Sequence, residues 1–194
     1  MELRFSDDFL KALEFSRDEA IRTGWHNIAP DHIMLGILRL ENDLIYEILG
    51  SVGVQAAEFK ASLDDAVFVD EAIAWDERDS VVFSDSARSF LQHACLEARR
   101  CGAFTVDPVH FILAVCRVAG PYSHDFLDSR GISLRDLVEA SGLDWDDYGL
   151  DPGIIRHSQP EEPSPGGIPD PILLAEQIEK RLREGYTTGI IPVS

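Results

Sequence analysis

Apolar residues recur at helical spacing directly after Ser6, and the pattern continues as far as Gly24. Phe9, Leu13 and Ala20 fall on one face of a helix with 3.6 residues per turn. Serine is a typical residue at the start of a helix, and glycine is typical just past the end of one. The pattern therefore predicts a helix that begins after Ser6 and ends near Gly24.

A second helical segment begins at Pro30 and is apolar on nearly all sides. Proline suits the first helical position, because its missing N–H would have no helical partner there, and Asp31 suits the positive end of the helix dipole. Helices that are apolar nearly all round lie at the centre of a bundle. We expect this helix and a similar one at Pro108 to form the core, with the apolar residues Ile33, Leu35, Ile37, Leu38, Phe111, Ile112, Leu113, Val115 and Cys116.

The pattern of the first half of the chain returns 78 residues later without a gap. The identities fall at helix starts, turns and apolar positions, which indicates a duplicated structural unit rather than low complexity. We expect the two copies to pack about a pseudo-twofold axis. Identical pairs include Phe5 and Phe83, Ser6 and Ser84, Leu13 and Leu91, Glu19 and Glu97, Arg22 and Arg100, Pro30 and Pro108, Arg39 and Arg117, and Gly53 and Gly131.

Each copy contains two further helical segments, which makes about eight helices in all. The third helices are expected at 43–49 and 122–127, and the fourth at 54–66 and 133–141. The fold class is therefore all-α, with two pseudo-twofold-related four-helix repeats. Repeat one is expected at 3–66 and repeat two at 83–142, within a domain of residues 1–148. The acidic connector at 67–82 is expected to be a surface loop.

The C-terminal segment differs in composition from the double repeat. Residues 149–169 are rich in proline and glycine, which is typical of a linker. Within 170–194, Leu174, Ile178 and Leu182 mark one face of a short amphipathic helix. Two interpretations stay open. In the first, the helix covers an apolar groove on its own domain or on that of a second copy. In the second, it is a partner-binding element joined by a flexible tether.

Composition and charge narrow the possible partners and compartments. A formal net charge of −18 disfavours binding to nucleic acid and to anionic membranes, and it favours basic partners. The chain has no run of eighteen apolar residues and no signal peptide, so we expect a cytoplasmic protein. Cys95, Cys101 and Cys116 lack metal-ligand spacing and are expected to be free thiols that act as small apolar side chains. The sequence leaves the oligomeric state open.

Candidate chemistry is sparse. His32 and His110 occupy equivalent positions, but no second histidine or acid follows at a ligand-like spacing. Each is expected to be a hydrogen-bonded residue of the core. No motif for nucleophilic or metal-assisted chemistry is present. We expect no catalytic residues, no metal, no cofactor and no enzymatic activity.

The central motif of repeat one, Asn27-Ile28-Ala29-Pro30-Asp31-His32-Ile33-Met34-Leu35-Gly36-Ile37-Leu38, strongly resembles that of the Clp repeat domain. This domain is the N-terminal module of the ClpC and ClpA class of AAA+ unfoldases, and the resemblance extends over residues 3–142. The sequence lacks a phosphate-binding loop, and the residues after repeat two are too few for an ATPase module. The chain thus resembles a free-standing copy of the unfoldase docking domain.

The resemblance also implies candidate ligand sites. In ClpC-type domains the glutamate of the central motif takes part in binding phosphoarginine; a carboxylate pairs with the guanidinium, and helix N-termini bind phosphate. Here the first motif has Asp31, whereas the second has Val109, which cannot pair with a guanidinium. At most one such site is expected. The alternative for Asp31 is an acid that only stabilises its own helix.

Phe5 and Phe83 match family positions where peptides dock, with Ser6 and Ser84 beside them. The alternative for the serines is simple helix capping, and for the phenylalanines packing in front of the cap.

From this resemblance we expect a noncatalytic protein-binding module that acts as an adaptor, competitor or regulator in Clp-dependent proteolysis. Its expected partners are a Clp unfoldase, its adaptors or its client proteins, with phosphoarginine or a peptide as a possible ligand. Two alternatives remain: a structural accessory subunit of the Clp protease complex, or an interaction domain recruited by an unrelated system.

Overall fold

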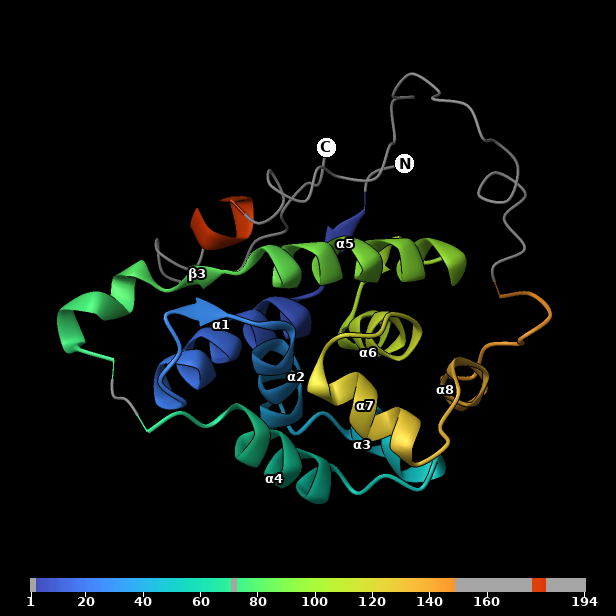
Figure 1. Cartoon of the computed structure of the whole chain (residues 1–194). Helices are drawn as coiled ribbons and strands as arrows, with labels where there is room; N and C mark the ends of the chain where they lie inside the picture. The colour runs from blue at the N-terminus through green and yellow to red at the C-terminus, as the bar shows by residue number, and fades with distance from the viewer. Residues whose placement is uncertain (1–2, 71–72, 149–175, 181–194) are drawn as a thin grey trace.

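The computed structural model describes residues 3–70, 73–148 and 176–180, and this part of the chain is predominantly helical (Figure 1). The expected all-α class is confirmed, and each repeat contributes four α-helices. Repeat one contains α1 (Asp7–Arg22), α2 (Pro30–Arg39), α3 (Asp43–Ser51) and α4 (Ala56–Val67). Repeat two contains α5 (Asp85–Arg100), α6 (Pro108–Arg117), α7 (Tyr122–Ser129) and α8 (Leu134–Ala140).

Four two-residue strands join the repeats in a crossed arrangement. Strand β1 (Arg4–Phe5) pairs in parallel with β4 (Thr105–Val106), and β2 (Asn27–Ile28) pairs in parallel with β3 (Val82–Phe83). The first strand of each repeat thus pairs with the second strand of the other, as a twofold relation requires. The sequence did not predict these strands, because two residues are too few to show alternation between buried and exposed positions.

The core lies around α2 and α6, as the sequence predicted. Figure 1 shows α5 across one side of these two helices and α3 and α4 on the opposite side. The ring of Phe111 on α6 lies between Phe9 of repeat one and Phe90 of repeat two, with centroid distances of 6.0 and 6.4 Å. Phe59 of α4 stacks on Phe126 of α7 at 4.3 Å. Aromatic packing therefore holds the repeats together as one core.

Helices α1 and α2 approach each other closely at Gly36. A β-carbon on this residue would lie 2.2 Å from the carbonyl oxygen of Ala12 and 2.8 Å from the backbone nitrogen of Ser16. Both distances are far shorter than an ordinary van der Waals contact. Only glycine allows the two backbones to cross at this separation.

The connector between the repeats is more ordered than expected. Residues 67–82 were predicted to be a surface loop, but Trp75–Ser80 forms the 3-10 helix η1, and Val82 begins strand β3. Asp76 and Glu77 occupy the first turn of η1, where negative charge is favourable. Pairing with β2 fixes the end of the connector, and a local sequence pattern cannot reveal such a tertiary contact.

Among the described residues, no helix is both long and apolar enough to cross a membrane.

Candidate functional site

The serines that precede α1 and α5 cap these helices. The Oγ of Ser6 accepts a hydrogen bond from the backbone N–H of Phe9 at 3.2 Å, and the Oγ of Ser84 accepts one from that of Ala87 at 3.1 Å. Phe5 and Phe83 are each only 2% exposed. A ligand at these positions would therefore meet the surrounding backbone and neighbouring side chains, rather than the phenylalanine rings.

The start of repeat two already has an occupant, residues 176–180, which we call the tail segment (Figure 1). The Oε1 of Glu179 accepts hydrogen bonds from the backbone N–H of Phe83 and from Nη2 of Arg88, both at 3.1 Å. Ile178 is 1% exposed and belongs to the main hydrophobic core. Of the predicted partner-binding residues, Ile178 thus packs on its own domain, while Leu174 and Leu182 lie outside the described residues.

Asp31 reaches across the repeat interface to cap α7. Its Oδ2 accepts a hydrogen bond from the backbone N–H of Tyr122 at 3.0 Å, and its Oδ1 accepts one from that of Ser123 at 2.8 Å. Pro121, the residue before α7, has no side chain that could cap it. Asp31 is 9% exposed. Its carboxylate belongs to repeat one and supplies the hydrogen-bond acceptor that the start of α7 in repeat two lacks.

The equivalent helix of repeat one has a different cap, which explains how Val109 is tolerated. The Oδ1 of Asn42 accepts a hydrogen bond from the backbone N–H of Ile45 at 3.2 Å, so α3 is capped from within its own repeat. Val109 is partly buried and packs against the core. The sequence placed Asp31 in the first turn of its helix correctly, but its partners are 91 and 92 residues away along the chain.

A buried carboxylate with two arginines occurs once in each repeat. The carboxylate of Glu19 pairs with Arg22 at 2.6 Å and with Arg39 at 3.2 Å. In repeat two, Glu97 pairs with Arg100 and with Arg117, the latter at 2.7 Å. These clusters join the first and second helices of each repeat. Sequence reasoning missed their pairing, although all three residues recur under the 78-residue shift.

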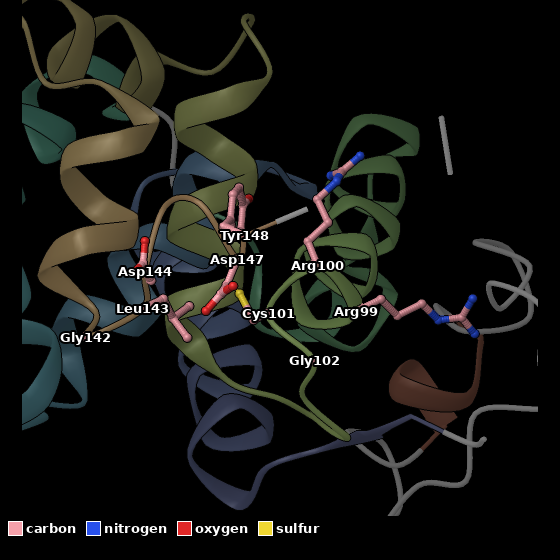
Figure 2. A pocket seen from close by; sticks show the side chains of 9 residues that line it. All are labelled: Arg99, Arg100, Cys101, Gly102, Gly142, Leu143, Asp144, Asp147 and Tyr148. Atoms are coloured by element: carbon pink, nitrogen blue, oxygen red, sulfur yellow. The ribbon is translucent and has the colours of Figure 1, made fainter. Parts of the chain in front are cut away.

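The cluster of repeat two borders an open pocket of about 730 Å³ at the end of α5. Figure 2 shows Arg99 and Arg100 on one side of this pocket and Leu143 and Asp144 on the other. Tyr148 also lines this pocket, and its phenol bonds Glu97 and accepts a hydrogen bond from Nη2 of Arg117 at 2.8 Å. The walls carry charges of both signs.

The three thiols are poor nucleophiles. Burial raises the pKa of Cys95 and of Cys101 to about 12 and that of Cys116 to about 11. The thiolate is the reactive form of cysteine, so these groups are inert at neutral pH. Cys95 is buried, and Cys101 and Cys116 are partly buried.

His32 and His110 serve the starts of their own helices. The Nδ1 of His32 accepts a hydrogen bond from the backbone N–H of Ala29 at 2.9 Å, and that of His110 accepts one from Asp107 at 2.8 Å. Since Nδ1 is an acceptor, the proton of neutral His32 is on Nε2, which bonds Oγ1 of Thr23 at 3.0 Å. Burial, aided by the charge of Arg22, lowers the pKa of His32 to about 4.

The described residues contain no group of three or more His, Cys, Asp or Glu side chains that could hold a metal ion. The buried charged groups of the double repeat instead cap helices or pair with arginines. These buried charged groups therefore stabilise the helical scaffold.

Comparison with known proteins identifies the scaffold. Residues 4–128 match the family described as Clp repeat (R) N-terminal domain, and the chain belongs to this family. The fold is similar to the crystal structure of the N-terminal domain of the ClpD chaperone from Arabidopsis thaliana, with a TM-score of 0.54 and 21% identity. That similarity covers 71% of this chain and 94% of the ClpD domain.

Two bacterial relatives are also similar in sequence. The chain is 26% identical over 132 residues to the chaperone protein ClpB of Oceanobacillus iheyensis, and 23% identical over 132 residues to ClpC/MecB of Bacillus subtilis, a negative regulator of genetic competence. Each match covers 68% of this chain but only 16% of the relative. The chain thus spans a small part of the length of these chaperones.

Proposed function

We propose that the chain is a noncatalytic protein-docking module that acts in the cytoplasm on Clp-dependent proteolysis, as an adaptor, competitor or regulator. The observation that carries this proposal is the double Clp repeat itself, which corresponds to nearly the whole N-terminal domain of a Clp chaperone. A net charge of −18 favours basic protein surfaces as partners.

An exposed apolar patch supports a docking role. Trp25, Phe68 and Val69 are 39%, 59% and 38% exposed. They lie together, because the Trp25 indole donates to the carbonyl of Val67 at 2.6 Å and the Val69 N–H donates to that of Thr23 at 3.0 Å. Clustered exposed apolar side chains are typical of protein-binding surfaces.

The direct test is a reconstituted degradation assay. Purified chain is titrated into a Clp unfoldase and peptidase that degrade a fluorescent client, and the initial rate is measured. A saturable rise or fall in the rate is expected. Phe68→Gln should weaken the effect, whereas Leu44→Gln, an exposed apolar position on α3, serves as the matched control. A rate that does not change at any concentration of the chain would exclude the proposed role.

Copurification separates the alternatives. A docking module should be recovered with the unfoldase, its adaptors or its clients. A structural accessory subunit should be recovered with the peptidase core, and an interaction domain of another system with neither. The experiment uses the full chain, tagged at its N-terminus, because the tail segment contacts β3 and the start of α5.

Phosphoarginine binding stays a prediction that requires the Asp31 carboxylate. Calorimetric titration with free phosphoarginine, with arginine and phosphate as controls, tests it. Asp31→Asn is the preferred variant, because its amide oxygen still accepts one hydrogen bond from α7 while the charge is lost. Binding by the wild-type chain and by Val109→Ala, but not by Asp31→Asn, would support the site. Equal binding by all three would refute it.

A further inference from the structure

The geometry points to a specific receptor site at the start of repeat two, which recognises a helix that presents an apolar residue followed by a glutamate. The tail segment is its built-in ligand, and partner helices with the same pair compete for it. This inference rests on the proposed function, since it names the class of helix that the docking module binds. We call this place the tail-binding site; it consists of the Phe83 N–H, the Arg88 guanidinium and the apolar surface that covers Ile178.

The first argument is the quality of the contact. Glu179 is 8% exposed, and its Oε1 lies 3.1 Å from both the backbone nitrogen of Phe83 and Nη2 of Arg88. Hydrogen bonds to a charged group in a partly enclosed site are stronger than neutral ones. The neighbouring Ile178 is almost fully buried in the core. Two adjacent side chains of opposite character are therefore recognised together.

The second argument is the asymmetry between the repeats. Under the 78-residue shift, Phe83 corresponds to Phe5, but Arg88 corresponds to Leu10. Leu10 is 2% exposed and carries no charge. Only repeat two can therefore pair with a glutamate at this place, so the contact does not follow from the fold that both repeats share. It depends on a residue particular to repeat two.

The third argument is that a partner helix can displace the tail segment from Arg88. Both of these hydrogen bonds use the same carboxylate oxygen, and the Nε–H of Arg88 is enclosed without a partner among the described residues. A carboxylate that approaches an arginine side-on can use Nε and Nη together. A partner helix that binds in this bidentate way would gain a hydrogen bond from Nε.

The surroundings of Glu179 also define the partner. In the sequence, Glu179 is followed by Lys180, Arg181 and Arg183 and has Glu176 and Glu184 nearby, so charges of both signs surround it. The three basic residues are complementary to a chain with a net charge of −18, and Glu179 offers a carboxylate to Arg88. The expected partner is thus a helix in which an Ile–Glu or Leu–Glu pair is followed by basic residues.

Attachment to the same chain sets how strongly the tail competes. An intramolecular ligand acts at an effective concentration on the order of 1 mM. A partner helix of micromolar affinity for the open site must therefore overcome this concentration. Weakening the contact of the tail should strengthen partner binding, even though the receptor side remains unchanged.

The test measures fluorescence anisotropy of a labelled synthetic peptide with the sequence of residues 170–186, titrated with full-length chain. In the chain, Glu179→Lys places a cation beside Arg88 and should release the tail. We expect this chain to bind the peptide at least tenfold more tightly than the wild-type chain. Adding Arg88→Gln should remove the gain, whereas adding Arg135→Gln, at an exposed ion pair on α8, should not.

A charge swap keeps the test independent of effects on folding. The chain with both Arg88→Glu and Glu179→Lys should bind the unmodified peptide poorly, because its own tail again matches its receptor. Equal peptide binding by the wild-type and Glu179→Lys chains, binding that is insensitive to Arg88→Gln, or no binding to any chain would each overturn the inference.

The peptide assay contains no unfoldase, so its failure is distinguishable from failure of the proposed function. If the chain alters Clp-dependent degradation but no variant binds the peptide, only the tail-binding site is refuted. If the peptide binds as expected but degradation is unaffected, the site stands as an intramolecular receptor and the role in proteolysis is refuted.

Discussion

Replacing Gly36 with alanine should destabilise the domain, although alanine is the better helix former. The new β-carbon would lie 2.2 Å from the carbonyl oxygen of Ala12 and 2.8 Å from the nitrogen of Ser16. Ordinary contacts begin near 3.4 Å, so α1 and α2 would have to move apart by about 1 Å. Both neighbouring atoms belong to the backbone, which cannot turn aside as a side chain can.

The expected size follows from this forced separation. Overpacking a closely packed core typically costs about 1–3 kcal/mol, and the gain in helix propensity returns at most about 1 kcal/mol. Ala12, Leu13 and Ser16 are all fully buried on the face of α1 that would be displaced. We expect Gly36→Ala to lower the free energy of unfolding by about 1–2 kcal/mol and to lower the melting temperature by several degrees.

Gly50 provides the matched control. It lies in α3 and is exposed, and a β-carbon added to it would meet no neighbouring atom within 4 Å. Gly50→Ala should therefore raise the free energy of unfolding by about 0.5–1 kcal/mol. Urea denaturation followed by circular dichroism measures both variants. If Gly36→Ala were as stable as the wild type, or if it matched Gly50→Ala, the close crossing of α1 and α2 would be refuted.

Three further changes test other contacts. Asp31→Ala removes both acceptors at the start of α7 and should lower the free energy of unfolding by roughly 1–2 kcal/mol, measured by urea denaturation. The pKa of His32 is about 4 in the folded protein and near 6.5 when unfolded, so the unfolded state binds more protons between these values. The contribution of His32 to stability should be constant above pH 6.5 and fall by roughly 3 kcal/mol as the pH drops to 4. Burial also lowers the pKa of His93 and His110, so His32→Asn should reduce this pH dependence rather than abolish it. Glu97→Ala leaves two arginines without their buried partner and should cost about 3 kcal/mol or more, whereas Glu139→Ala at an exposed ion pair should cost less than about 1 kcal/mol.

Much of the fold could be predicted from local signals. Glycines at helix ends were informative, since Gly24 and Gly102 both adopt positive φ directly after the C-cap residues of α1 and α5. Pro30 and Pro108 begin α2 and α6 as expected. These signals act through backbone geometry within one turn, which is why the sequence alone reveals them.

The hydrogen bonds that form the candidate sites join residues that are distant in the sequence. Asp31 caps α7, and Glu179 binds Phe83 and Arg88 more than ninety residues away. A first-turn acid and an amphipathic tail were visible, but their partners depend on how the repeats pack. The clusters around Glu19 and Glu97 could have been inferred from the sequence, because Arg39 and Arg117 recur with the two glutamates under the 78-residue shift.

The crossed strand pairs have a consequence for how this architecture can arise. Because β1 pairs with β4 and β2 with β3, each repeat completes its edges only with the other. A single repeat made as a separate chain would leave both strands unpaired, and a twofold homodimer would restore the same pairing. The present chain provides both halves of this pairing in one polypeptide. Within one chain the two halves can carry different residues: Asp31 of repeat one reaches α7 of repeat two, and Arg88 occurs in repeat two alone.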